Sequence, residues 1–206
     1  MKRNLFKKTL EWRYLFSTRD VYRLFPSFDK RRLSEWKNSW KIIPIKRGWW
    51  LFSWYPQNIP FLRKSANLIY TPSYISLQSA LKRYWLIPET VVVHLSMSTK
   101  KTALVSSKVW TFSYSSIKSD LFFWYTIITD LWISFLIAEP EKALCDLFYT
   151  DITLRDNDSF EELRIEPYVF YEYIDEKKLI NYAEKYPSTV LTAIKKFLLF
   201  MKNSVW

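Results

Sequence analysis

Glycine is nearly absent from this sequence, whose 206 residues include only Gly48. Globular proteins average about 7% glycine, which they use where a turn or a helix end needs a positive φ. Tryptophan, in contrast, occurs 11 times. The shortage of one residue type and the excess of another suggest a common cause.

Cysteine and histidine are equally scarce, with one of each. The single cysteine, Cys145, excludes an internal disulfide and is typical of the reducing cytoplasm, where we expect the protein. The single histidine, His94, excludes the clustered spacings of zinc sites. It lies in an apolar stretch without a second histidine or a nucleophile pattern, which predicts a packed side chain rather than a catalytic one. We therefore expect no metal and no cofactor.

Neither an export signal nor a membrane span is expected. The basic residues 1–8 are followed by "TLEWRYLFSTRD", which lacks the apolar core of a signal peptide. Residues 121–138, "LFFWYTIITDLWISFLIA", are long enough to cross a bilayer. Asp130, in the middle of that run, would oppose insertion by about 2.5–3.5 kcal/mol. Two buried β-strands that meet at "TDLW" explain the run better.

The positive charge is concentrated in the first third of the chain. Residues 1–64 contain 16 Lys and Arg against 4 Asp and Glu, a balance of +12, whereas residues 65–206 have a balance of −1. A compact segment with such an excess attracts polyanions, and nucleic acid is the commonest of them because binding releases its counterions. A solvated basic surface without a partner is the alternative.

Residues 17–38 have the pattern of two short helices joined by a turn. In "STRDVYRLFP", Ser17 or Thr18 can cap a first helix that Pro26 ends. In "DKRRLSEWKNSWK", Asp29 can cap a second helix. The apolar residues of each helix fall on one side; they are Val21, Leu24 and Phe25 in the first and Leu33 and Trp36 in the second.

The polar side of the second predicted helix carries donors suited to phosphates and base edges. These candidate DNA-binding residues are Lys30, Arg31, Ser34, Lys37 and Asn38. "IIPIKRGWWLF" follows, and its two β-rich runs around Lys46, Arg47 and Gly48 predict a hairpin with a cationic turn. This order of elements predicts a winged helix-turn-helix. Its second helix would enter the major groove of duplex DNA, and Lys46 and Arg47 would contact the backbone or the minor groove.

The whole chain is expected to have an α+β fold of two domains. Residues 1–53 form the predicted winged helix-turn-helix domain, residues 54–65, with two prolines, a linker, and residues 66–206 a mixed α+β domain. Strands of this second domain are expected in "TVVVHLSMST", "KTALVSS", "VWTFSYSSI" and the 121–138 run. Helices are expected in "SLQSALKRYWLIPE", capped by Ser76, in "EPEKALCDLFYT", in "DEKKLINYAEKY" and in "STVLTAIKKFLLFMKNS".

Three blocks of the sequence resemble the AbiE-type (AbiEi family) antitoxins, bacterial regulators in type IV toxin-antitoxin systems of abortive infection. "PSYISLQSALKRYWLIPE" and "IAEPEKALCDLFY" are similar to two motifs of that family, and "IIPIKRGWWLFS" to its wing. The resemblance implies an N-terminal winged domain that binds inverted repeats of operator DNA and represses its own operon. It also implies a second domain that antagonises a nucleotidyltransferase-like toxin encoded beside it, an action that need not involve contact with the toxin.

Five tryptophans depart from the pattern of that family. Trp40, Trp85, Trp124 and Trp132 stand where the family tends to have glycine, and Trp110 is expected in a turn between strands. We hypothesise that the gene comes from a bacterium that decodes UGA as glycine, and that these codons have been translated as tryptophan. The alternative is that the tryptophans are stacking platforms for single-stranded nucleic acid. Their distribution over turns and helix ends of both domains argues against one stacking surface.

We expect a DNA-binding protein without catalytic residues rather than an enzyme. The candidate carboxylates are Glu139, Glu141, Asp146 and the acidic run "DNDSFEELRIE" at 156–166. A nuclease needs carboxylates that converge on a metal near a positioned lysine, but Lys142 points off another face of the predicted helix than Glu141. Helix capping explains Glu139 and Glu141, and a solvated loop explains the acidic run. A metal-dependent nuclease and a stand-alone winged-helix regulator are the alternatives.

Overall fold

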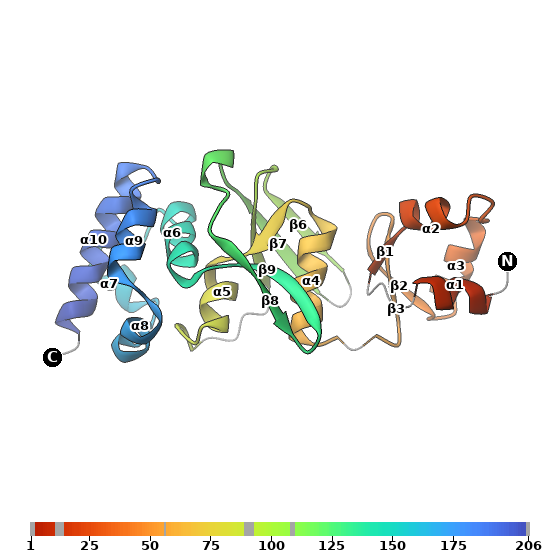
Figure 1. Cartoon of the computed structure of the whole chain (residues 1–206), viewed down its shortest axis with the longest axis horizontal. Helices are drawn as coiled ribbons and strands as arrows, with labels where there is room; N and C mark the ends of the chain where they lie inside the picture. Colours follow the sequence, from red (N-terminus) through yellow and green to blue (C-terminus); the bar gives the residue numbers. More distant parts are fainter. Residues whose placement is uncertain (1–2, 11–14, 56, 89–92, 108–109, 205–206) are drawn as a thin grey trace.

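The computed structural model describes residues 3–10, 15–55, 57–88, 93–107 and 110–204. These residues form a mixed α+β fold with two β-sheets. In Figure 1 the N-terminal helices lie at one end of an elongated molecule, the larger sheet occupies the middle, and the C-terminal helices form the other end. The α+β class predicted from the sequence is confirmed.

The small sheet is antiparallel, with the strand order β1-β3-β2. β2 (Ile42–Lys46) and β3 (Trp49–Phe52) form the predicted hairpin, and β1 (Leu15–Ser17), which the sequence does not predict, pairs with β3. Two of the three accompanying helices match the predicted pair, and the first is not predicted. They are α1 (Arg3–Leu10), α2 (Thr18–Leu24) and α3 (Arg31–Asn38).

The small sheet packs apolar side chains on both of its faces. Successive residues of a strand point to opposite faces, and on β3 Phe52 joins a core with the three N-terminal helices. Its neighbour Leu51 joins the core of the larger sheet instead. The N-terminal unit is therefore packed against the rest of the molecule.

The predicted linker at 54–65 is largely helical, so this prediction is wrong. α4 (Ile59–Ile69) begins within it, and the side chain of Asn58 accepts a hydrogen bond from the Phe61 N–H at 3.0 Å. Pro60, which suggests a connection in the sequence, lies in the first turn of α4. A proline there removes an N–H that has no partner within the helix, so the helix tolerates it.

The larger sheet has six strands in the order β6-β7-β5-β4-β9-β8. They are β4 (Ser73–Ile75), β5 (His94–Ser98), β6 (Ala103–Ser106), β7 (Thr111–Ser116), β8 (Tyr125–Asp130) and β9 (Ile133–Ala138). Residues 90–92, at the start of the predicted strand "TVVVHLSMST", lie outside the described residues.

The 121–138 run contains the β8–β9 hairpin, as predicted, with its turn at the end of "TDLW". The prediction that both strands are buried is wrong for β8. It is an edge strand, and Ile127 in its middle is 67% exposed. Among the helices in the described part of the chain, none is long and apolar enough to cross a membrane.

The described residues form six further helices and one 3₁₀ turn. They are α5 (Leu77–Arg83), η1 (Ser119–Leu121), α6 (Pro140–Thr150), α7 (Asn157–Glu161), α8 (Pro167–Tyr173), α9 (Glu176–Ala183) and α10 (Ser188–Asn203). The sequence predicts α5, α6, α9 and α10, but it predicts a solvated loop at 156–166. That prediction is wrong, because Phe160 of α7 is buried and Asp156 caps the helix by accepting a hydrogen bond from the Ser159 N–H at 3.0 Å.

A buried polar cluster joins β4, α5 and α6 around the carboxylate of Asp146. The carboxylate accepts hydrogen bonds from the hydroxyls of Tyr74 at 2.9 Å, Ser76 at 2.7 Å and Tyr186 at 2.7 Å. Lys142, one turn earlier on α6, forms an ion pair with it at 2.6 Å, and both charged side chains are fully buried. The first and second motif blocks therefore meet inside the protein.

The protonation of this cluster follows from its burial. Burial lowers the pKa of Lys142, and the charge of Asp146 opposes that effect. Burial also raises the pKa of Tyr74 and Tyr186, and the Asp146 carboxylate raises both further, so both hydroxyls remain hydrogen-bond donors. Lys142 donates additionally to the Leu121 carbonyl at 2.9 Å and to the Tyr186 hydroxyl.

Ser76 shows how the cluster overrides local helix chemistry. It occupies the N-cap position of α5, as predicted, but its side chain makes no cap hydrogen bond. Its hydroxyl donates to Asp146 instead. The predicted capping role is wrong, because the Ser76 hydroxyl is directed at the buried Asp146 carboxylate, for which a hydrogen-bond donor is worth more than in water.

Replacing Lys142 with methionine is expected to reduce the free energy of unfolding by about 3–5 kcal/mol, because the Asp146 carboxylate would stay buried without its cation. Adding Asp146→Asn should recover part of this loss, since the amide still accepts hydrogen bonds but carries no charge. Urea unfolding monitored by circular dichroism measures both values. Lys195→Met, at an exposed position of α10, is the control and should change stability by less than about 0.5 kcal/mol. A double variant that is less stable than the single one would contradict the prediction.

Candidate nucleic-acid interface

The candidate interface is built on α2, α3 and the β2–β3 hairpin. Ser17 caps α2 as predicted: its hydroxyl accepts a hydrogen bond from the Asp20 N–H at 3.1 Å, and the Asp20 carboxylate accepts one from the Ser17 N–H at 2.8 Å. The helix ends before Pro26, and Val21 is buried beneath it. Leu24, predicted on the inner side, is 40% exposed.

The apolar side of α3 is buried, so its polar side faces solvent. Leu33 and Trp36 are buried in the core of the N-terminal unit, as predicted. Lys30 is the N-cap residue, and the Asp29 carboxylate accepts a hydrogen bond from the Arg31 N–H at 2.9 Å. Asp29, the predicted capping residue, therefore accepts a hydrogen bond from the first turn of the helix, although it lies one residue before the N-cap position.

The five residues predicted to contact the major groove are all exposed. They are Lys30, Arg31, Ser34, Lys37 and Asn38. The last four recur at spacings of three and four residues, which places them on one side of α3. Among the described residues, the ion pairs involve none of the three cations of this set. Their charge therefore faces solvent.

The turn of the hairpin uses the one glycine of the chain. Arg47 and Gly48 form this two-residue turn, and Gly48 has φ +79°, which a residue with a Cβ atom rarely adopts. Thr18, the first residue of α2, holds the turn in place. Its N–H donates to the Gly48 carbonyl at 2.8 Å, and its hydroxyl accepts a hydrogen bond from the Trp50 indole at 3.1 Å.

The two cations of the hairpin have different surroundings. Arg47 is exposed at the turn. Lys46 is half-buried, and its Nζ lies 5.2 Å from the centroid of the Tyr70 ring, which follows α4. A cation over an aromatic ring is attracted to it. Lys46 therefore helps to join the hairpin to the rest of the molecule, whereas Arg47 is the cation of the turn that a polyanion can reach.

A cavity of about 680 Å³ lies beside the hairpin. Lys30, Lys46 and Arg47 line it together with Ser106 and Ser107 at the end of β6. The remaining candidates lie on α3 and do not line it; they are Arg31, Ser34, Lys37 and Asn38. The sequence gives no signal for the two serines, because they reach the hairpin only through the packing of the N-terminal unit against the larger sheet.

The carboxylates Glu139 and Glu141 make structural contacts with α9. Lys178 lies 3.1 Å from the Glu139 carboxylate and 3.0 Å from that of Glu141. The Tyr182 hydroxyl also donates to Glu139 at 2.6 Å. Glu139 is the N-cap residue of α6 but makes no side-chain cap hydrogen bond, so the capping interpretation is wrong for it. Both carboxylates therefore link the start of α6 to α9, through ion pairs with Lys178 and the hydrogen bond from Tyr182.

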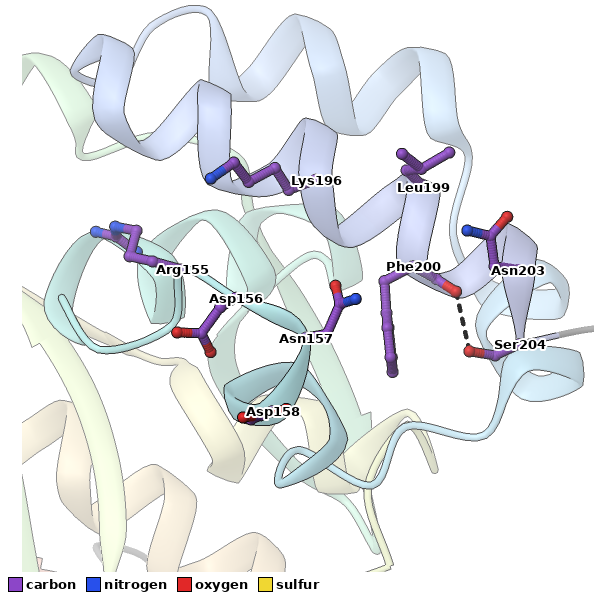
Figure 2. A pocket seen from close by; sticks show the side chains of 9 residues that line it. All are labelled: Arg155, Asp156, Asn157, Asp158, Lys196, Leu199, Phe200, Asn203 and Ser204. Carbon is purple, nitrogen blue, oxygen red and sulfur yellow. Dashed lines mark hydrogen bonds between the residues drawn. The ribbon is translucent and has the colours of Figure 1, made fainter.

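The first three residues of the acidic run, 156–158, line an open groove of about 710 Å³ beside α10 (Figure 2). Asp156 and Asp158 share this groove with the cations Arg155 and Lys196. Hydrogen bonds from Ser159 lower the pKa of Asp156. Within the described residues, no group of three or more His, Cys, Asp or Glu side chains could hold a metal ion. The groove therefore carries both positive and negative side chains, and one of its carboxylates, that of Asp156, caps α7.

His94 is packed rather than poised for proton transfer. It is half-buried on β5, with its ring 5.7 Å from that of Phe112 on the neighbouring strand. Burial lowers the pKa of His94 to about 4, and the positive charge of Arg63 contributes. The imidazole is therefore neutral near pH 7.

The sequence matches no protein-family model and no curated protein. Function is therefore inferred from the cationic residues of α3 and the hairpin, and from the three motif blocks.

His94 is expected to make the protein less stable as the pH falls. Its pKa is about 4 in the folded chain and about 6.5 in an unfolded one, so the unfolded state binds the proton first as acid is added. Between pH 7 and pH 5 the free energy of unfolding should drop by roughly 2 kcal/mol from this group. His94→Gln should remove that part of the drop in urea unfolding at the two pH values. The same drop in the variant would contradict the prediction.

Proposed function

We propose that the protein is a DNA-binding antitoxin of the cytoplasm that represses its own toxin-antitoxin operon. In this proposal α1–α3 and the small sheet act as a winged helix-turn-helix. α3 enters the major groove of operator DNA, and the β2–β3 hairpin is the wing that contacts the backbone or the minor groove.

The observation that carries the proposal is the exposed cationic face of α3 together with Lys30 at its N-terminus, which lines the same cavity as the exposed Arg47 of the hairpin turn. Leu33 and Trp36 fix the rotation of α3 about its axis, and Thr18 fixes the turn against α2. The backbone positions that carry the cations are therefore fixed by packing. Cations at fixed positions favour a polyanion of fixed shape, such as duplex DNA, and argue against a basic surface that serves only solubility.

The antitoxin role is supported by the resemblance of the motif blocks. Tyr74 and Ser76 of the first block bond to Asp146 of the second, so a physical contact explains why the two blocks occur together. That contact lies in the core and offers no surface for a toxin. A stand-alone winged-helix regulator is therefore the second candidate, and co-expression with the neighbouring gene distinguishes the two.

Binding to inverted repeats upstream of the gene is expected to weaken when Arg31 and Lys37 are both replaced by alanine. If each cation contacts one phosphate, the slope of log K against log salt should become shallower by about 1.8. Fluorescence anisotropy with a labelled promoter fragment over a series of salt concentrations measures this slope.

The matched control is Lys185→Ala with Lys195→Ala. It removes the same charge from exposed positions near and on α10 and should leave the slope nearly unchanged. An equal change in the control would show that net charge alone determines binding. No shift of the promoter fragment by the unaltered protein at low salt would contradict the DNA-binding proposal.

Co-expression with the adjacent gene is expected to relieve a growth arrest that this gene causes alone. The Arg31→Ala, Lys37→Ala variant should still relieve the arrest when both genes are expressed from promoters that the protein does not control. Growth curves in a heterologous host measure the effect. DNA binding without relief of growth arrest would identify the stand-alone regulator, and cleavage of DNA in the presence of magnesium would favour the nuclease.

A further inference from the structure

Four tryptophans have a backbone conformation that a side chain disfavours. The φ angle is +54° at Trp40, +62° at Trp85, +52° at Trp124 and +66° at Trp132. A positive φ is uncommon for residues other than glycine and is an outlier for a bulky one, because Cβ crowds the backbone. Nine of the 11 tryptophans lie in the described residues, so nearly half of these adopt it.

Trp85 lies at the end of α5 in the position that usually carries glycine. The N–H of Leu86 donates to the Leu81 carbonyl at 3.0 Å, and the N–H of Trp85 donates to the Lys82 carbonyl at 3.2 Å. These two bonds define the Schellman motif. Trp85 is the residue that must turn left-handed for both bonds to form.

Trp40 ends α3 in the same way. The N–H of Lys41 donates to the Trp36 carbonyl at 2.9 Å, and the N–H of Trp40 donates to the Lys37 carbonyl at 3.1 Å. The same motif thus occurs at two helix ends, with tryptophan at the glycine position both times.

Trp132 lies in the turn of the β8–β9 hairpin. Asp130 pairs with Ile133, so Leu131 and Trp132 form a two-residue turn. Both have a positive φ, +46° and +66°, which is the pattern of a type I′ turn. The second position of that turn strongly prefers glycine.

Packing offers little compensation for three of these four conformations. Trp132 is 94% exposed, Trp40 76% and Trp85 67%. Trp124 is half-buried, but its ring stacks face to face on Tyr182 with centroids 3.5 Å apart. Aromatic pairs prefer an offset or edge-on arrangement at a larger separation. Trp40, Trp85 and Trp132 therefore gain little from the fold that strains their backbone, whereas Trp124 packs partly against the core of the larger unit.

The other five described tryptophans have no positive φ. Trp110, which the sequence groups with the four, is 9% exposed and packs edge-on against Phe61 with centroids 5.5 Å apart. It is a core residue, and the structure gives no reason to assign glycine there. The positive φ angles thus select four tryptophans and leave Trp36, Trp49, Trp50, Trp54 and Trp110 as ordinary ones.

We infer that positions 40, 85, 124 and 132 carry glycine in the protein that the cell makes, and that their codons are UGA read as glycine. One reassigned codon explains the positive φ angle at all four tryptophans, and it accounts for part of the shortage of glycine and of the excess of tryptophan. A stacking surface for single-stranded nucleic acid explains the excess of tryptophan but neither the shortage of glycine nor the positive φ angles. It also requires aligned rings, whereas two of the four positions follow α3 and α5 and the other two flank β8, and Figure 1 shows these three elements apart from one another.

The codons and the natural protein test the inference directly. We expect UGA at codons 40, 85, 124 and 132, and peptides from the source organism whose masses correspond to glycine at these positions. UGG codons at these positions overturn the inference. UGA codons with tryptophan in the peptides overturn it as well, because the codon is then read as tryptophan.

Thermal unfolding provides a second, independent test. Trp85→Gly and Trp85→Ala both remove the exposed indole, but only glycine relaxes the positive φ. The unfolding midpoint of the glycine variant should therefore be higher than that of the alanine variant by roughly 2–4 °C. The same order is expected for Trp132→Gly and Trp132→Ala.

Trp54 is the matched control, since it is 46% exposed and has no positive φ. There the order should reverse, because glycine adds conformational freedom to the unfolded chain without relieving strain. Glycine variants at Trp85 and Trp132 that are no more stable than their alanine counterparts overturn the inference.

Discussion

The fold of the larger unit depends on one buried carboxylate, that of Asp146. A buried carboxylate that water does not reach needs a counter-ion and hydrogen-bond donors around it. Here the donors come from four segments: β4, the start of α5, α6 and the segment between α9 and α10. Ser76 and Tyr186 lie 70 and 40 residues from Asp146 along the chain. These four segments therefore have to meet at one point, which restricts how the helices can pack on the sheet.

The small sheet joins the candidate DNA interface to the larger unit. Because its strands are apolar on both faces, they pack on α1–α3 with one face and on the larger unit with the other. Lys46 over the Tyr70 ring strengthens the second contact. The hairpin turn is thus held from two sides, by Thr18 of α2 and by the larger unit. Arg47 and α3 keep a fixed relation to each other, as recognition of a rigid duplex requires.

Local patterns predict the elements whose signals lie within one segment. The predictions of a helix cap at Ser17 or Thr18, of the apolar side of α3 and of the hairpin around Gly48 are confirmed for this reason. The predictions fail where a local signal has two meanings. Pro60 suggests a linker but begins a helix, and the acidic run suggests a loop but contains the capped helix α7. They fail also where burial depends on distant neighbours, as at the exposed edge strand β8.

The sequence by itself determines the basic first third of the chain, the helix–helix–hairpin order and the imbalance between glycine and tryptophan, because each is a property of composition or of neighbouring residues. Only the tertiary structure decides that Ser76 serves Asp146 rather than its helix, that Lys46 faces Tyr70, and that Ser106 and Ser107 join the hairpin cavity. It also shows which tryptophans have a positive φ. The physical reason is that hydrogen-bond partners and backbone conformations are selected by packing between segments far apart in the chain, which no local pattern records.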